Sequence, residues 1–117
     1  MAISGILSTA VSGLANASSR VAASADNIVN ANTPGYQAKE VRSSTIVTQQ
    51  TSGTNYASGG VSSVIRTNPD PTVVNGSNVD IANEFIKIIQ AEIAYKASLE
   101  VISTSEDLAK DLINIRA

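Results

Sequence analysis

The chain has 117 residues, a net charge of −2, and neither cysteine nor histidine. This length suits one domain, the charge gives no sign of a nucleic-acid surface, and disulfides and the usual zinc ligands are excluded. Aromatic residues make up only 3% of the chain, so a core would consist of small aliphatic side chains, which favour close packing between helices.

The first predicted element is a long helix over residues 3–31. Its apolar residues recur at alternating spacings of four and three, as in a heptad seam, and only Ser24 interrupts the pattern. At 1.5 Å per residue this helix would be about 43 Å long. Arg20 and Asp26 are its only charged residues, so the helix needs apolar partners. The contact residues predicted on its seam are Ile3, Leu7, Leu14, Val21 and Ile28.

The same N-terminal residues can also be compared with a signal peptide. Residues 3–14 are moderately apolar, and Ala15-Asn16-Ala17 resembles a cleavage site. However, no lysine or arginine precedes Arg20, and polar residues interrupt the apolar run. We therefore expect the start of a mature helix and no cleaved leader. No apolar run reaches the roughly 18 residues of a membrane span, so direct membrane insertion is not expected.

A sharp turn is predicted where the first helix ends. Pro34 lacks an amide proton and pushes Thr33 out of helical geometry. Gly35 tolerates dihedral angles that other residues avoid, so Pro34-Gly35 favours a tight turn. The turn is either an ordinary helix stop or a joint that fixes the direction in which the next segment leaves the helix, and Tyr36 is large enough to anchor that segment against the helices.

The middle of the chain, residues 37–77, is polar and has no helical period. Apolar residues at 46–47 and 61–65 flank a glycine-containing stretch, which is compatible with either a plain loop or a β-hairpin. Turn residues follow, at Asn68-Pro69-Asp70-Pro71 and Asn75-Gly76.

A second long helix is predicted from residue 78 or 80 to residue 115, about 54 Å at 1.5 Å per residue. Either Asn78 or Asp80 can cap it. Two acid-first pairs four residues apart, Glu92/Lys96 and Glu106/Lys110, favour helix. Its apolar residues form two adjacent stripes, an arc wider than one partner covers. The contact residues predicted on these stripes are Phe85, Ile89, Ile93, Tyr95, Leu99, Ile102, Leu108 and Leu112.

These elements predict a mainly α fold: two long terminal helices forming an antiparallel, coiled-coil helical hairpin, with a short loop or β-hairpin between them. The expected divisions are 1–36, the first helix and its turn; 37–77, the polar linker; and 78–117, the second helix. The acidic residues lie on helical faces beside lysines, and no phosphate-binding loop occurs. We therefore expect no catalytic residues, no metal ligands and no cofactor.

Two motifs resemble signatures of a known family. The run Asp26 to Tyr36, with Asn-Ile-Val-Asn followed by Thr-Pro-Gly-Tyr, resembles the N-terminal signature of the bacterial flagellar rod and hook axial proteins. The run Asn78 to Phe85 and the following Ala94-Tyr95-Lys96-Ala97 resemble that family's C-terminal signature, and Gly59-Gly60 resembles a glycine pair common after its first motif. The residues matching the family motifs include Asn27, Asn30, Thr33, Pro34, Gly35, Tyr36, Asn78, Val79 and Asp80.

The resemblance implies a structural subunit of the flagellar basal-body rod, exported through the flagellar type III apparatus without cleavage. Copies of the chain and of other axial proteins would then stack helically, and the rod they build transmits torque for motility. The chain has no room for the outer domains of hook and distal-rod proteins, so it resembles a minimal, proximal-rod-like member. Departures from the pattern at Val29, Glu92 and Ile93 affect the expected neighbour contacts.

Two other functions remain open at this stage. The chain can be an adaptor between axial segments, present in few copies, or a cytoplasmic helical hairpin that binds a component of the export system. Counting copies in basal bodies distinguishes a low-copy adaptor from a repeated rod subunit. Retention in the cytoplasm would favour the binding protein of the export system.

Overall fold

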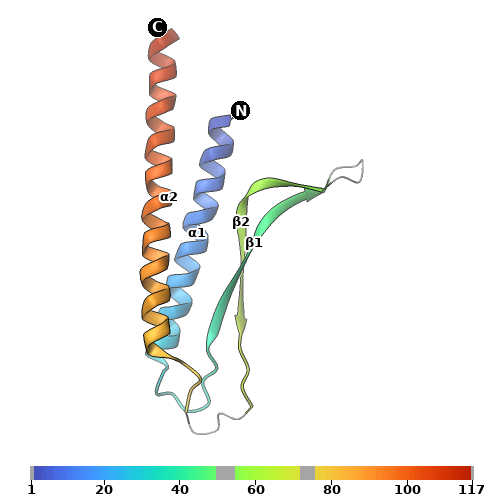
Figure 1. Ribbon diagram of the computed structural model, residues 1–117, viewed down its shortest axis with the longest axis vertical. Helices are drawn as coiled ribbons and strands as arrows, with labels where there is room; N and C mark the ends of the chain where they lie inside the picture. Colours follow the sequence, from blue (N-terminus) through green and yellow to red (C-terminus); the bar gives the residue numbers. More distant parts are fainter. Residues whose placement is uncertain (1, 50–54, 72–75, 117) are drawn as a thin grey trace.

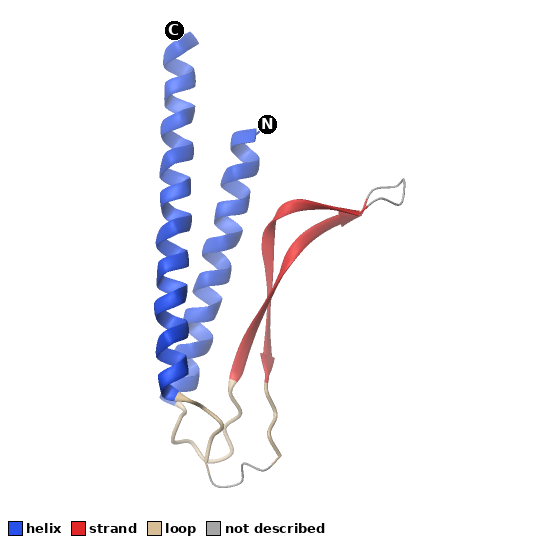
Figure 2. Cartoon of the chain, viewed as in Figure 1, coloured by secondary structure: helices blue, strands red, loops and turns tan. Residues whose placement is uncertain are grey.

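The computed structural model describes residues 2–49, 55–71 and 76–116. Within these ranges it contains helices α1 (Ala2–Val29) and α2 (Ile81–Arg116) and strands β1 (Lys39–Gln49) and β2 (Asn55–Thr67). Figure 2 shows the two helices side by side and the strands paired as a long β-hairpin. The predicted mainly α helical hairpin is confirmed, and the middle segment forms a β-hairpin.

The elements form an open arrangement. Helices α1 and α2 run antiparallel, so both chain ends lie at one end of the molecule, while the β-hairpin starts at the other end and runs along α1 before bending away (Figure 1). The backbone of the hairpin approaches α1, and in the described residues it does not approach α2. The radius of gyration is 19.0 Å, against about 13 Å for a compact domain of this size. Much of the surface is therefore left without an intramolecular partner.

The helix ends follow from local sequence. Helix α1 stops at Val29, two residues earlier than predicted, and the amide of Thr33 donates to the carbonyl of Asn30 at 2.9 Å as the chain turns. Helix α2 starts at Ile81 and is capped by Asp80, whose carboxylate accepts from the backbone amide of Asn83 at 3.3 Å and from its side-chain amide at 2.9 Å.

The ion pairs of α2 agree only in part with the expected ones. Lys96 lies 2.8 Å from Glu92, as predicted. The predicted pair between Glu106 and Lys110 is wrong, because Lys110 instead pairs with Asp107 at 3.6 Å. The side chains of the two lysines are 71% exposed, so neither pair contributes much to stability.

Small residues form the contact between the two helices. On α1 the buried side chains recur every seven residues, at Ala10, Ala17 and Ser24, and on α2 Ala91 and Ser105 are buried on either side of the half-buried Ser98. Such side chains let the helix backbones approach closely. The larger aliphatic side chains of both helices consequently lie mostly outside this interface.

The β-hairpin has one face toward α1 and one toward solvent. Ser43 and Ser63, which are cross-strand partners, both donate to the side-chain oxygen of Asn16, at 2.6 and 2.8 Å. Closer to the bend of the hairpin, the amide of Val61 donates to the Ser12 hydroxyl at 3.0 Å. The docking of the hairpin on α1 therefore relies largely on polar contacts.

A glycine pair lies where the hairpin bends. The strand register shifts between Thr45 and Val47, opposite Gly59 and Gly60, which have φ values of 87° and 99°. A Cβ atom at Gly60 would lie 3.0 Å from the Ser12 hydroxyl oxygen. Glycine is thus needed here both for the positive φ and for the close approach to α1.

No helix in the described ranges has the combination of length and apolar character that crossing a membrane requires.

Candidate functional site

Asn27 is the central residue of the joint, by which we mean residues 26–39 and 76–80 at the closed end of the helical hairpin. It is fully buried. Its side-chain oxygen accepts from the Tyr36 hydroxyl at 2.9 Å and from the Lys39 amide at 2.7 Å, and its side-chain nitrogen donates to the Lys39 carbonyl at 2.8 Å. One side chain on α1 therefore fixes both the tyrosine after the turn and the first residue of β1.

The predicted turn has the geometry of a type II turn. Pro34 and Gly35 occupy its two central positions, Gly35 has a φ of 74°, and the Tyr36 amide donates to the Thr33 carbonyl at 3.2 Å. Asn30, directly after α1, supports the turn, since its side-chain oxygen accepts from the Thr33 hydroxyl at 3.2 Å. The motif residues from Asn30 to Tyr36 thus form one connected unit.

Asn78 joins the second motif to the first. Its side-chain oxygen accepts from the Ala38 amide at 2.6 Å, and its side-chain nitrogen donates to the Asn68 carbonyl at 2.8 Å. It therefore holds the entry to β1 and the exit from β2 against the segment that leads into α2. Beside it, the Gly35 amide donates to the Gly76 carbonyl at 3.0 Å, and the neighbouring Val79 is half-buried.

An ion pair lies beside this network. The Lys39 ammonium group pairs with the Asp26 carboxylate, and this hydrogen bond holds the pKa of Asp26 below its ordinary value and the pKa of Lys39 above its own. Burial, with the negative charge of Asp26, raises the pKa of Tyr36. The lysine, the aspartate and the tyrosine therefore keep their ordinary charges at neutral pH.

Glu84 is a buried acidic residue whose position the sequence did not reveal. Only 3% of it is exposed; one carboxylate oxygen lies 3.1 Å from the Lys87 ammonium, and the other has no hydrogen-bond partner. Glu84 lies in the first turn of α2, where an acidic side chain interacts favourably with the positive end of the helix dipole. Burial next to the joint depends on how the two helices meet, which no local pattern reports.

The residues predicted to contact other subunits fall into two groups. Three are half-buried within the chain, namely Leu14, Ile28 and Ile102, and the side chain of Ile3 lies outside the described residues. The others are exposed, up to 64% for Ile93. These exposed residues are Leu7, Val21, Phe85, Ile89, Ile93, Tyr95, Leu99, Leu108 and Leu112.

Helix α2 therefore has two distinct faces in the structure, an inner face that packs on α1 and an outer face with large side chains. The sequence pattern predicted a single wide apolar arc. The inner face packs on α1 through Ala91, Ser98 and Ser105, which were not among the predicted contact residues. Their spacing of seven was the available signal, but small and polar residues do not stand out in an apolar pattern. The outer face carries large aliphatic side chains along most of the helix.

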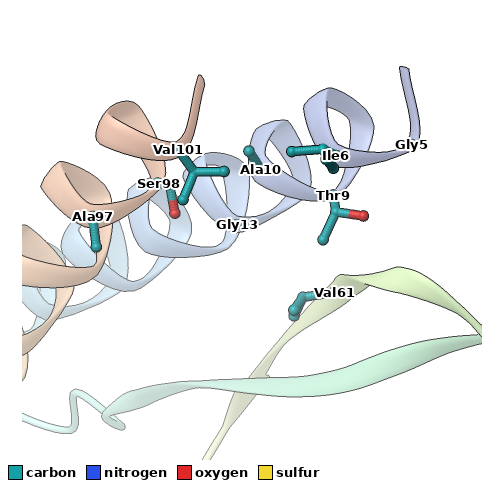
Figure 3. Close-up of a pocket in the computed structure, with 9 residues that line it drawn as sticks. All are labelled: Gly5, Ile6, Thr9, Ala10, Gly13, Val61, Ala97, Ser98 and Val101. Carbon is teal, nitrogen blue, oxygen red and sulfur yellow. The ribbon is translucent and has the colours of Figure 1, made fainter. Parts of the chain in front are cut away.

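An open apolar groove of about 620 Å³ lies between the N-terminal half of α1 and the middle of α2. Figure 3 shows its lining: five residues of α1, three of α2, and Val61 of β2. A second groove of about 390 Å³ shares Ile6, Ala97 and Val101 with the first and continues toward Leu108. In the described parts of the chain no cluster of acidic residues is arranged to hold a metal ion.

Comparison with known proteins agrees with the motifs. A family model described as flagella basal body rod protein matches residues 7–37, and a model described as flagellar basal body rod FlgEFG protein C-terminal matches residues 71–115. These ranges contain the joint except for residues 38 and 39, and together they cover more than half of the chain. No curated protein matches significantly.

Two long terminal helices, a short hairpin and a joint that ties them define a structural axial protein. The chain belongs to the bacterial flagellar basal-body rod and hook family, and its role is that of a structural component of the flagellum.

Proposed function

We propose that the chain is a minimal, proximal-rod-like axial subunit that assembles helically through the outer faces of α1 and α2. One observation carries this proposal: among the described residues the fully buried side chains are no larger than Asn27, whereas Ile89 and Ile93 are more than half exposed. Burying an aliphatic side chain of that size is worth about 1.5–3 kcal/mol. A neighbouring subunit that covers the outer face of α2 would therefore provide most of the hydrophobic stabilisation that the isolated chain lacks.

The partners in this proposal are other copies of the chain and other flagellar axial proteins. Stacking of one surface on a different surface of the next copy builds an open helical structure. We further propose that the chain reaches the rod through the flagellar type III export apparatus with its N-terminus intact. The joint then sets the direction of the β-hairpin relative to the packed helices.

Charge substitutions on α2 test the proposal. Ile93→Lys places a charge on the outer apolar face, where an unpaired buried charge costs several kcal/mol on assembly. Its matched control is Ser103→Lys, which adds the same charge at an exposed position on the face that carries Lys96 and Lys110. Both variants should be secreted equally and fold equally as monomers, because both positions are exposed.

The readout is the amount of each variant in purified basal bodies, together with motility. We expect Ile93→Lys to be depleted and Ser103→Lys to be incorporated. Equal incorporation of the two would show that the outer face of α2 is not a subunit contact. Counting the copies of the unmodified chain per basal body separates a repeated rod subunit from a low-copy adaptor, and absence from basal bodies with retention in the cytoplasm would favour an export-system binding protein.

A further inference from the structure

A long uncharged stretch occupies most of the β-hairpin. Between Arg42 and Arg66 the sequence contains no charged residue and no proline. The stretch is rich in serine and threonine with β-branched aliphatic residues among them, a composition that favours extended structure. Exposed edge strands of soluble proteins usually carry lysine, proline or other features that prevent pairing with further strands. Neither lysine nor proline occurs in this stretch.

In the described residues each strand also has an outer edge with no strand partner, and α1 covers that edge at Lys39 of β1 and at Val61 of β2. In the described part of the chain the sheet consists of β1 and β2 alone, so each strand has a strand partner on one side only. The amides of Lys39 and Val61 donate to side chains of α1 and not across the hairpin. Because amide directions alternate along an antiparallel pair, the odd-numbered residues between the base of the hairpin and the register shift at Thr45 point their amides away from the partner strand. These include Val41, Ser43 and Thr45 on β1, and Ser63 and Ile65 on β2.

We propose that the outer edge of β1 in one copy, from Val41 to Thr45, pairs with the outer edge of β2 in a second copy, at Ser63 and Ile65. This inference rests on the proposed self-association and adds to it a second contact, at a site separate from the helix faces. Copies stacked in one orientation bring the ascending β1 of one subunit beside the descending β2 of the next, which is the antiparallel arrangement already present within the hairpin.

The distribution of charged residues along the hairpin favours a second copy of the chain as the partner at this edge. The charged residues of the hairpin lie near its base, where Glu40 is the cross-strand partner of Arg66. If pairing between copies keeps this register, Glu40 comes to lie beside Arg66 of the second copy. Above the base, the edges oppose uncharged residues only, so no like charges meet. A two-stranded hairpin is marginally stable alone, and further strands would stabilise it.

Cysteine cross-linking between copies tests the pairing, because the natural chain has no cysteine. Ser44→Cys places one thiol on the solvent-facing side of β1. This variant is mixed in turn with Ser62→Cys, Val64→Cys or Arg66→Cys, which place one thiol on the same side of β2 at successive registers. Each chain then carries a single thiol, so every disulfide joins two copies, and a disulfide forms only where the Cα atoms come within about 7 Å.

We expect one of the three mixtures to give mixed disulfide dimers in assembled material, several-fold above the Ser44→Cys homodimer, and none of them to do so in dilute monomer. Assembly without such an excess at any register would overturn the edge pairing and leave the proposed function standing. If the unmodified chain does not self-associate and is absent from basal bodies, the proposed function fails, and the edge pairing fails with it.

Discussion

Gly13 of α1 lies directly against Ser98 of α2: a Cβ atom built on the glycine would be 2.9 Å from the serine hydroxyl oxygen. The two helices approach closely at this point because one side contributes no side chain and the other a very small one (Figure 3). The contact also lies in the apolar groove, so it sets the separation of the helices where the groove is open.

Gly13→Leu should therefore destabilise the helical hairpin. Overpacking of a tight contact costs about 1–3 kcal/mol. Gly5→Leu is the matched control, because a Cβ atom at Gly5 meets nothing within 4 Å and the same side chain can be added without a clash. Urea unfolding followed by helical circular dichroism measures both. Equal midpoints for the two variants would show that the helices do not pack at Gly13 in solution.

Asn27→Ala should be among the most destabilising substitutions at the joint. It removes the hydrogen-bond partner of the Tyr36 hydroxyl and of both backbone groups of Lys39, and each buried group left unsatisfied costs about 1–3 kcal/mol. Asn16→Ala also removes the acceptor of two hydrogen bonds, but their serine donors can bond to water instead. The difference in unfolding free energy is the measurement. A smaller loss for Asn27→Ala than for Asn16→Ala would contradict the central role of Asn27.

Gly35→Val should impair assembly and motility. The positive φ of Gly35 costs other residues about 1–2 kcal/mol, and more for a β-branched one. Gly76→Val serves as control, because Gly76 lies in the same joint, has no positive φ, and has open space around its Cβ position. The alternative control Ser58→Val falls on a side chain outside the described residues. Equal motility at equal secreted amounts would show that the turn does not direct the hairpin.

The Asp26–Lys39 pair should give the joint a defined pH range. The pKa of Asp26 is lowered on folding, so its contribution is present above the ordinary carboxyl range and is lost as the pH falls through the lowered value. The pKa of Lys39 is raised, so its contribution is present below the ordinary lysine pKa of 10.5 and is lost as the pH rises through the raised value. The pair therefore stabilises the fold between about pH 4 and pH 10.

Asp26→Asn tests this pH dependence. The variant should be less stable than the natural chain at pH 7, and the difference should shrink as the pH falls through the lowered pKa of Asp26 and its carboxyl group becomes neutral. Asp107→Asn, at an exposed pair, should have little effect at any pH. A difference between Asp26→Asn and the natural chain that does not shrink as the pH is lowered would assign the effect to something other than the charge.

The sequence predicted the elements well where the signal was local. Pro34 and Gly35 defined the turn, Asp80 was one of two predicted caps, and the helical spacing of apolar residues located both helices. The hydrogen bonds of Asn27 and Asn78 could not be predicted from local pattern, because they join residues 12 and 40 positions apart in the chain. The motif resemblance marked these asparagines, and the fold supplies the physical reason.

The sequence also could not predict which face of α2 packs against α1. Periodicity locates apolar faces, but it does not say which face meets the other helix of the same chain. Here that face is the one with Ala91, Ser98 and Ser105, since close approach favours small side chains over a large side chain such as Ile93. The predicted subunit contacts on the outer face remain a proposal that the Ile93→Lys experiment tests.

Because the buried side chains are small, a mutational scan of this chain needs a different interpretation from the usual one. Alanine scanning normally identifies a core, because removing large buried side chains leaves cavities. In the described residues the buried apolar side chains are all alanine, so that scan would pass over the helix interface without effect. Apart from Asn27 at the joint, its strong responses would instead mark the outer faces, and only in assembled material. Replacing small residues with large ones is the scan that would map the inside of this protein.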